Sequence, residues 1–288
     1  MKTPVTFKTL PLPELSIFYR EAGDPQAPVA LLLHGFPSSS HMFRNLIPEL
    51  SDHYRVIAPD LPGFGFSGAP DHQVFRYTFD HLAEILGQFV AELGLQKFAI
   101  YAFDYGAPVG FRVALKYPNR ISAIISQNGN AYLEGLSDAW SPIRAYWEHP
   151  TQQNRDALRS FCTEEITRFQ YIQGVKDAQT RIAPEAIALD QALLNRRQNV
   201  EIQLDLFGDY QSNLRLYPKF QEFFRAYRPP TLAVWGRNDP FFLPAGAEAY
   251  RRDNPEAKVV FYDTGHFALE THAAEIGREM RTFLAQHL

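Results

Sequence analysis

The sequence predicts an α/β protein with a mostly parallel central sheet, helices on both faces and an inserted helical cap. Two observations lead to this fold class. Short, almost wholly apolar runs alternate with helical patterns in the first and last parts of the chain, as in a parallel sheet covered on both faces. The stretch between them, residues 130–226, has helical segments rich in charged residues, Gln and Asn, but no comparable apolar run.

Strands are expected where these apolar runs are bounded by turn residues. The expected strands lie at residues 5–10, 15–23, 29–34, 54–60, 98–103, 121–127, 231–236 and 257–263. The first two are joined by a Pro-rich turn, and the third and fourth each lead into a loop. We therefore assign residues 1–129 and 227–288 to an α/β core and residues 130–226 to a helical cap inserted in it.

The clearest helix is expected at residues 78–93, because apolar residues recur there at spacings of three and four. These residues are Leu82, Ile85, Leu86, Phe89, Val90 and Leu93. A second helix is expected at 107–116, ending before Pro118. A final helix at the end of the chain holds Ile276, Met280, Phe283 and Leu284.

The composition is that of an ordinary globular protein. Of the 288 residues, 45% are hydrophobic and 21% are charged, which excludes a disordered, collagenous or coiled-coil chain. The net charge is −4, without the basic excess that is typical of nucleic-acid binders. We therefore expect a small-molecule substrate and no nucleic-acid partner.

The expected location is the cytoplasm. Cys162 is the single cysteine, so no internal disulfide argues for an oxidising compartment. The first twenty residues contain three prolines and lack the apolar core of a signal peptide. No apolar run approaches the roughly 20 residues of a membrane span, so no membrane partner is expected. We leave open whether the protein forms a homodimer.

The sharpest motif is Ala102-Phe103-Asp104-Tyr105-Gly106-Ala107, between an expected strand and an expected helix. Small residues flank a central residue, which is the layout of a nucleophile elbow. The small residues let the two backbones approach closely at a strained turn, and the central side chain is held above the sheet. That central residue is Asp104 rather than the more common Ser.

With this turn, the chain resembles the α/β-hydrolase family over essentially its whole length. H-G-F-P at 34–37 and D-L-P-G-F-G-F-S at 60–67 precede the elbow, each after an expected strand. Asp239 follows the strand at 231–236, and His266 follows the last strand. The order of nucleophile, acid and histidine matches the chain order of the family.

The resemblance implies roles for individual residues. Asp104, Asp239 and His266 would form a catalytic triad, and the backbone N–H groups of Phe36 and Tyr105 would form the oxyanion hole. His34 would order its loop rather than act in catalysis, and the peptide before Pro37 is a candidate for the cis form. The sequence shows no metal-ligand spacing and no nucleotide-binding motif, so neither a metal nor a cofactor is expected.

A carboxylate at the elbow changes the chemistry that the fold can perform. It is already anionic at pH 7 and can attack an sp³ carbon directly, which forms an alkyl-enzyme ester. The histidine then activates the water that attacks the ester carbonyl of Asp104, and the oxyanion hole holds the negative charge. The resemblance is therefore to epoxide hydrolases and haloalkane dehalogenases rather than to esterases, lipases or peptidases.

The residues around the nucleophile lower the haloalkane and haloacetate dehalogenase readings, although Tyr105 also stands where epoxide hydrolases usually carry Trp. Haloalkane dehalogenases typically have Trp after the nucleophile and Asn or Trp as a second halide donor, whereas this chain has Tyr105 and Phe36. Haloacetate dehalogenases place Arg after the nucleophile, and this chain does not. We therefore expect an epoxide hydrolase. Haloalkane or haloacid dehalogenation by the same mechanism is the alternative, and a non-catalytic ligand-binding protein is the third reading.

Epoxide opening needs a proton donor for the emerging alkoxide. Related epoxide hydrolases use cap tyrosines for this step, and Tyr146 and Tyr210 lie near the usual offsets from the nucleophile and from the acid. Tyr171 is the alternative candidate for the role expected of Tyr146. Trp147 has two interpretations, since its indole N–H could bind a halide and its ring could simply pack.

Overall fold

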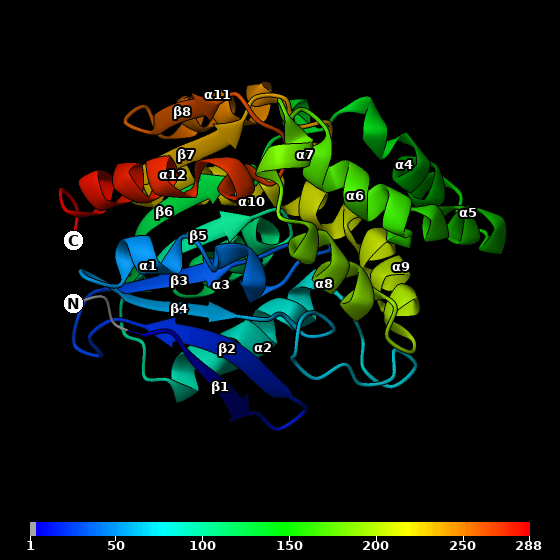
Figure 1. Cartoon of the computed structure of the whole chain (residues 1–288), viewed down its shortest axis with the longest axis horizontal. Coiled ribbons are helices and arrows are strands. Elements are labelled where there is room, and N and C mark those ends of the chain that lie inside the picture. The colour runs from blue at the N-terminus through cyan, green and yellow to red at the C-terminus, as the bar shows by residue number, and fades with distance from the viewer. Residues whose placement is uncertain (1–3) are drawn as a thin grey trace.

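The computed structural model describes residues 4–288 and is built around one eight-stranded sheet. The strands are β1 Thr6–Pro11, β2 Ser16–Ala22, β3 Val29–Leu33, β4 Arg55–Pro59, β5 Phe98–Phe103, β6 Ile121–Gln127, β7 Thr231–Gly236 and β8 Lys258–Tyr262. Their order is β1-β2-β4-β3-β5-β6-β7-β8, stacked from bottom to top in Figure 1. β1, β2 and β4 pair antiparallel and the other pairs are parallel. The predicted mostly parallel sheet is confirmed.

Helices cover both faces of this sheet. They are α1 Ile47–Leu50, α2 Phe79–Glu92, α3 Gly106–Lys116, α11 Pro244–Asp253 and α12 Ala268–Leu284. Successive strand residues point to opposite faces, so Ile100 lies in an apolar cluster with α2, α3 and α11, and Tyr101 lies in a second cluster with α1 and α12. Figure 1 is viewed from the side of α1 and α12. The predicted helices correspond to α2, α3 and α12.

The chain between β6 and β7 is helical, and we call residues 130–226 the helical insertion. Its elements are η3 Leu133–Gly135, η4 Asp138–Trp140, α4 Ser141–Glu148, α5 Gln152–Ala157, η5 Leu158–Cys162, α6 Glu164–Ile172, α7 Ala178–Arg181, α8 Pro184–Leu194, α9 Asn199–Asp209 and α10 Gln211–Tyr227. In Figure 1 the helices α4 to α9 lie at the right, beyond the carboxyl ends of the parallel strands. The boundaries of a cap domain stay a prediction.

A buried arginine ties the helical insertion to the α/β core. Arg112, on α3, is 7% exposed. Its guanidinium donates to Asn213 Oδ1 at 2.6 Å and to Ser212 Oγ at 3.0 Å, both on α10, and pairs with Asp80 Oδ1 at 2.6 Å. Because a charged group is costly to bury unless it is paired, these contacts fix α10 against the core.

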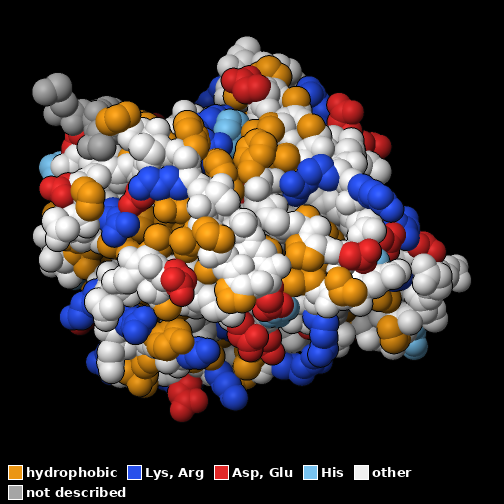
Figure 2. All heavy atoms as spheres, turned by 90° about the horizontal axis from the view of Figure 1, so that it is seen from below, with side chains coloured by type: hydrophobic (Ala, Val, Ile, Leu, Met, Phe, Trp, Pro, Cys, Tyr) orange, Lys and Arg blue, Asp and Glu red, His pale blue; other side chains and the backbone are white. Residues whose placement is uncertain are grey.

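Charges of both signs are interspersed on the surface. Figure 2 shows acidic and basic side chains alternating with hydrophobic ones across the face it displays, in keeping with the small net charge of −4. Several basic side chains of the protein have acidic partners, such as Lys8 with Glu21 at 2.5 Å. Within residues 4–288, no helix has both the length and the hydropathy that crossing a bilayer requires.

Candidate active site

Asp104 stands at the sharp turn from β5 into α3, where its φ is +47°. Two glycines make the turn possible. A Cβ atom at Gly106 would lie 2.3 Å from the carbonyl oxygen of Leu33, and a Cβ atom at Gly35 would lie 2.2 Å from Asp104 Oδ1. The small residues of the elbow therefore let β3 and its following loop approach the aspartate.

Two backbone N–H groups hold the Asp104 carboxylate. Phe36 N donates to Oδ1 at 2.7 Å, and the N–H of Tyr105 also hydrogen-bonds the carboxylate. These are the two N–H groups that the sequence predicts for the oxyanion hole. The Phe36–Pro37 peptide is cis, as expected. Oδ1 is thus held by the N–H of Phe36, while Oδ2 is the carboxylate oxygen nearer His266, at 4.0 Å from Nε2.

His266 lies between the two predicted aspartates. Its Nδ1 is 2.7 Å from Asp239 Oδ2, and its Nε2 is 4.0 Å from Asp104 Oδ2. Because a carboxylate only accepts hydrogen bonds, Nδ1 carries a proton, and in the neutral ring Nε2, the nitrogen nearer Asp104, has the free lone pair. The three residues that the sequence predicts as a triad are therefore brought together.

Asp239 is held by more than the histidine. Asn128 Nδ2 donates to Asp239 Oδ2 at 2.7 Å, and Phe241 N donates to Oδ1 at 2.7 Å. Asn128 follows β6 with φ +46° and accepts from Gly236 N at 2.9 Å. The sequence analysis missed Asn128, although its position directly after a strand, at the same sheet edge as Asp104, was a usable signal.

His34 orders the loops under the site, as the sequence predicts. It is fully buried, its Nε2 accepts from Leu61 N at 2.9 Å, and its Nδ1 is 3.0 Å from Gly35 O. Asp60 accepts from Ser40 N at 2.7 Å. The loops after β3 and β4 are thereby fixed to each other, and this positions the N–H of Phe36.

Burial and charge both shift the pKa values of the central pair. Burial raises the pKa of Asp104 to about 6, although His266 and the N–H groups of Phe36 and Tyr105 act against this rise. Burial alone would lower the pKa of His266, but Asp239 and Asp104 outweigh it, and the pKa is raised from its ordinary value. At pH 7 Asp104 is therefore mostly anionic, and His266 binds a proton more readily than a free histidine.

Asp104 and His266 open onto a small apolar pocket of about 30 Å³, which we call the inner pocket. Its walls are Phe36, Asp104, Tyr105, Ala139, Trp140, Ile143, Phe161, Gln170, Phe207, Phe241, Phe242 and His266. The core supplies the floor, and the helical insertion supplies the roof. This space is far below the 300–1,000 Å³ of drug-sized ligand sites, so it suits a substrate of few atoms.

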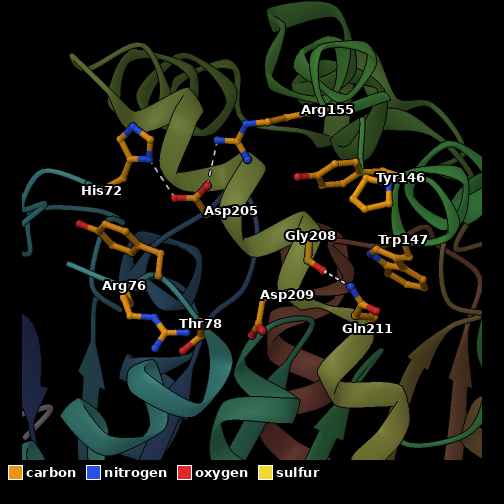
Figure 3. Close-up of a pocket in the computed structure, with 12 residues that line it drawn as sticks. His72, Arg76, Thr78, Tyr146, Trp147, Arg155, Asp205, Gly208, Asp209 and Gln211 are labelled. Carbon is orange, nitrogen blue, oxygen red and sulfur yellow. Dashed lines mark hydrogen bonds and ion pairs between the residues drawn. The ribbon is translucent and has the colours of Figure 1, made fainter. Parts of the chain in front are cut away.

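Tyr146 and Trp147 line a different cavity, shown in Figure 3 and called here the outer pocket. Its volume is about 370 Å³. In Figure 3 the Tyr146 ring points towards Arg155 and Asp205 and Trp147 lies beside Gln211, and the indole N–H of Trp147 donates to Phe207 O at 2.8 Å. Neither residue lines the inner pocket. The structure therefore does not bring either residue to the predicted site, because α4 extends away from Asp104.

Tyr210 lies between the two pockets without lining either. Its ring packs on Trp140 of the inner pocket at 4.4 Å and parallel to Trp147 of the outer pocket at 6.2 Å. Its hydroxyl is hydrogen-bonded to Tyr217. The fallback, Tyr171, stacks on Phe267 at 4.0 Å and bonds to Asp190, away from the inner pocket.

The roof of the inner pocket was missed by the sequence analysis. Trp140, Ile143, Phe161, Gln170 and Phe207 come from five separate helical elements of the insertion. No motif or spacing marks such residues, since each belongs to an ordinary buried helix face. Phe241 and Phe242 had a usable signal, because they follow Asp239 by two and three residues.

The loops that hold Asp239 and His266 pack closely on the backbone of the helical insertion at residues 173–174. A Cβ atom at Gly265, beside His266, would lie 1.9 Å from Gln173 O. Gly174, with φ +77°, packs on Asn238, whose Nδ2 donates to Gly174 O at 2.9 Å. Glycine at 174 and 265 therefore permits a contact that a side chain would block.

Comparisons with known proteins agree with this geometry. Residues 28–273 match the α/β-hydrolase fold family. YNR064C of Saccharomyces cerevisiae, described as an uncharacterized hydrolase, is 49% identical over 278 residues, 95% of this chain and 94% of that protein. A haloalkane dehalogenase of Bradyrhizobium diazoefficiens is 39% identical over 126 residues, 43% of this chain and 40% of that protein. The structure of the epoxide hydrolase CorEH has a TM-score of 0.79 at 19% identity, covers 98% of this chain and 99% of its own, and so shares the fold.

Proposed function

The chain belongs to the α/β-hydrolase fold family and is a hydrolase, and we propose that it opens small epoxides to diols through a covalent ester on Asp104. One observation carries the proposal. Oδ1 of Asp104 accepts from the N–H of Phe36 at 2.7 Å, the N–H of Tyr105 also hydrogen-bonds the carboxylate, and Oδ2 lies 4.0 Å from Nε2 of His266. This arrangement suits a carboxylate nucleophile that is later hydrolysed by water.

In the first half-reaction, Oδ2 of Asp104 attacks a ring carbon of the epoxide and the carbon–oxygen bond breaks. The ring oxygen takes a proton from a nearby hydroxyl, for which we assign Tyr105. Burial raises the pKa of Tyr105, so its hydroxyl stays protonated at neutral pH and is able to donate. The product of this step is a hydroxyalkyl ester of Asp104 and an ionised Tyr105.

In the second half-reaction, water attacks the ester carbonyl while His266 Nε2 takes its proton. Oδ1 becomes the oxyanion, stabilised by the N–H groups of Phe36 and Tyr105. When the intermediate collapses, the departing alkoxide takes the proton from His266 and leaves as the diol. The carboxylic proton that remains on Asp104 replaces the one that Tyr105 gave up, so the cycle is closed.

The hydrogen-bond partners of the tryptophan N–H groups and of the Tyr105 hydroxyl favour an epoxide substrate over a haloalkane. All three tryptophan N–H groups donate to backbone carbonyls: Trp140 to Phe241 O at 3.2 Å, Trp147 to Phe207 O at 2.8 Å and Trp235 to Phe242 O at 2.8 Å. The buried hydroxyl of Tyr105, in contrast, has no hydrogen-bond partner among residues 4–288. A hydroxyl can transfer a proton to an alkoxide, whereas a halide needs no proton.

Haloalkane dehalogenation is the second candidate, since a haloalkane dehalogenase is 39% identical to part of this chain. One experiment separates the two activities. The purified protein is given a panel of C2–C6 epoxides and a matched panel of C2–C6 haloalkanes, and diol and free halide are measured. Diol formation supports the proposal; halide release that exceeds diol formation contradicts it in favour of the second candidate.

Tyr105→Phe is expected to lower epoxide turnover by about 10²–10⁴, the usual contribution of general acid catalysis, because the proton donor is lost. The ring and the backbone N–H of residue 105 are kept. Tyr146→Phe is the matched control and should stay within about threefold of the unmodified protein, since Tyr146 lines the outer pocket. Steady-state diol formation measures both. Equal rates for the Tyr105 variant and the unmodified protein would remove Tyr105 from the mechanism.

The rate of ester formation should fall as the pH drops through about 6, because protonation of Asp104 removes the nucleophile and the pKa of Asp104 is raised to about 6. Ester hydrolysis should need a higher pH, since His266 must be neutral to accept a proton and its pKa is also raised. Rapid-mixing mass spectrometry between about pH 5 and 9 follows both steps. A formation rate that does not change between pH 7 and 5 contradicts this assignment.

A further inference from the structure

Gln170 is the one carboxamide in the walls of the inner pocket. It lies on α6, is 3% exposed, and its Nε2 is buried without a hydrogen-bond partner among residues 4–288. The buried polar side chains near it on α6 have partners: Thr167 Oγ1 donates to Gln191 Oε1 at 2.7 Å, and the hydroxyl of Tyr171 bonds to Asp190. Of these three residues, Gln170 is the one that lines the inner pocket and the one with an unpartnered polar atom.

A buried N–H group without an acceptor costs free energy, and a buried group of this kind in a native protein calls for an explanation. Methionine has nearly the same size and shape and would fill the same space at no such cost. The inner pocket is otherwise walled mostly by aromatic and aliphatic side chains. An acceptor atom that enters this pocket with a ligand is therefore the partner that the N–H group of Gln170 lacks.

The direction of nucleophilic attack indicates which ligand atom this is. Displacement at an sp³ carbon requires the leaving atom on the side of the carbon opposite the attacking oxygen. Asp104 attacks from the floor of the inner pocket, so the leaving atom lies on the side of the attacked carbon away from the Asp104 carboxylate, where Tyr105 approaches it from the side wall and the helical insertion approaches it from the roof. In the roof, Ala139, Ile143, Phe161 and Phe207 are apolar, and the N–H of Trp140 already donates to Phe241 O at 3.2 Å. Gln170 is the roof residue whose side-chain N–H donor has no partner.

We infer that Gln170 Nε2 donates a hydrogen bond to the atom that leaves the carbon attacked by Asp104. The inference rests on the proposed function and adds a catalytic residue to it. The amide polarises the carbon–oxygen bond and stabilises the developing alkoxide, while Tyr105 supplies the proton. No bond to Gln170 forms or breaks. The hydrolysis of the ester, in which that atom has already left, does not depend on Gln170.

The test uses Gln170→Met in the full chain, with Gln203→Met as the matched control. Gln203, on α9, is also fully buried and also has an unpartnered polar atom, Oε1, but it does not line the inner pocket. Ester formation and ester hydrolysis are followed separately by rapid-mixing mass spectrometry. Gln170→Met should slow ester formation by about 10- to 100-fold and leave hydrolysis of the ester within about twofold. Gln203→Met should change neither step by more than about threefold.

Thermal unfolding of the same variants distinguishes a catalytic from a structural role. Because Nε2 has no partner to lose, Gln170→Met should unfold at the same temperature as the unmodified protein or at a higher one. A lower unfolding temperature together with equal slowing of both half-reactions would overturn the inference in favour of a structural role. Ester formation at the unmodified rate in a folded Gln170→Met variant would overturn it as well.

A binding measurement keeps this inference separate from the proposed function. If no compound of either panel forms an ester, the proposed mechanism fails, and the affinity for propane-1,2-diol is then measured by calorimetry. Weaker diol binding by Gln170→Met than by Gln203→Met would still support a donor at Gln170. Equal affinity, or no binding by the unmodified protein, would overturn it.

Discussion

Asp104→Asn is expected to abolish formation of the alkyl ester and to lower turnover by about 10⁴–10⁶, the range seen when a catalytic nucleophile is removed. A neutral amide is a poor nucleophile, and it would also replace the negative charge that the N–H groups of Phe36 and Tyr105 hold in place. The fold should be retained, because Asn keeps the size of the side chain and tolerates the positive φ of +47° at this turn.

Single turnover in H₂¹⁸O measures the same step in the unmodified protein. Water attacks the Asp104 carbonyl, so the first turnover should place the label in the Asp104 peptide rather than in the diol. Label found in the diol during the first turnover would show direct attack of water on the substrate. Freshly purified Asp104→Asn with unchanged turnover, after deamidation is excluded by mass spectrometry, would likewise rule out the covalent mechanism.

His266→Gln is expected to leave ester formation largely intact and to slow its hydrolysis by about 10³ or more, because glutamine cannot take the proton from water. The enzyme mass should then increase by the mass of the substrate and stay increased. Asp239→Asn should have a smaller effect in the same direction, since Asp239 orients His266 through the 2.7 Å contact with Nδ1.

Intact-mass spectrometry after mixing with an epoxide identifies this species directly, and peptide mapping should locate it on Asp104. The same measurement on the unmodified protein is the control, in which the adduct should be transient. An inactive His266→Gln variant with no adduct would mean that His266 acts before ester formation rather than after it.

The fold and the centre of the site could be predicted because their signals are local or follow from the sheet. All eight expected strands occur, and the apolar runs of the central ones, such as β3, β5 and β7, suit a sheet that is covered on both faces. Asp104, Asp239 and His266 each follow a strand end. Since the carboxyl ends of parallel strands meet at one edge of the sheet, their order along the chain was enough to bring them together.

The roof of the inner pocket could not be predicted, because it depends on how the helices of the insertion pack. Offsets along the chain pointed to Tyr146 on α4, yet α4 presents Ile143 to the inner pocket. Tyr146 lies one helical turn, about 5 Å, further along the axis, which places it at the outer pocket. Periodicity marks the apolar face of such a helix but does not tell which turn of that face meets the substrate.

The backbone contact between Gly265 and Gln173 has a consequence for the evolution and engineering of this protein. A new insertion grafted from a relative would have to keep the chain path past residues 173–174 if the loop of His266 is to keep its position, because the backbone at Gly265 packs directly on Gln173 O. A graft that shifts this path displaces the loop of His266 and inactivates the enzyme even if every roof side chain is kept. Substrate range can therefore diverge through single roof substitutions more readily than through exchange of whole modules.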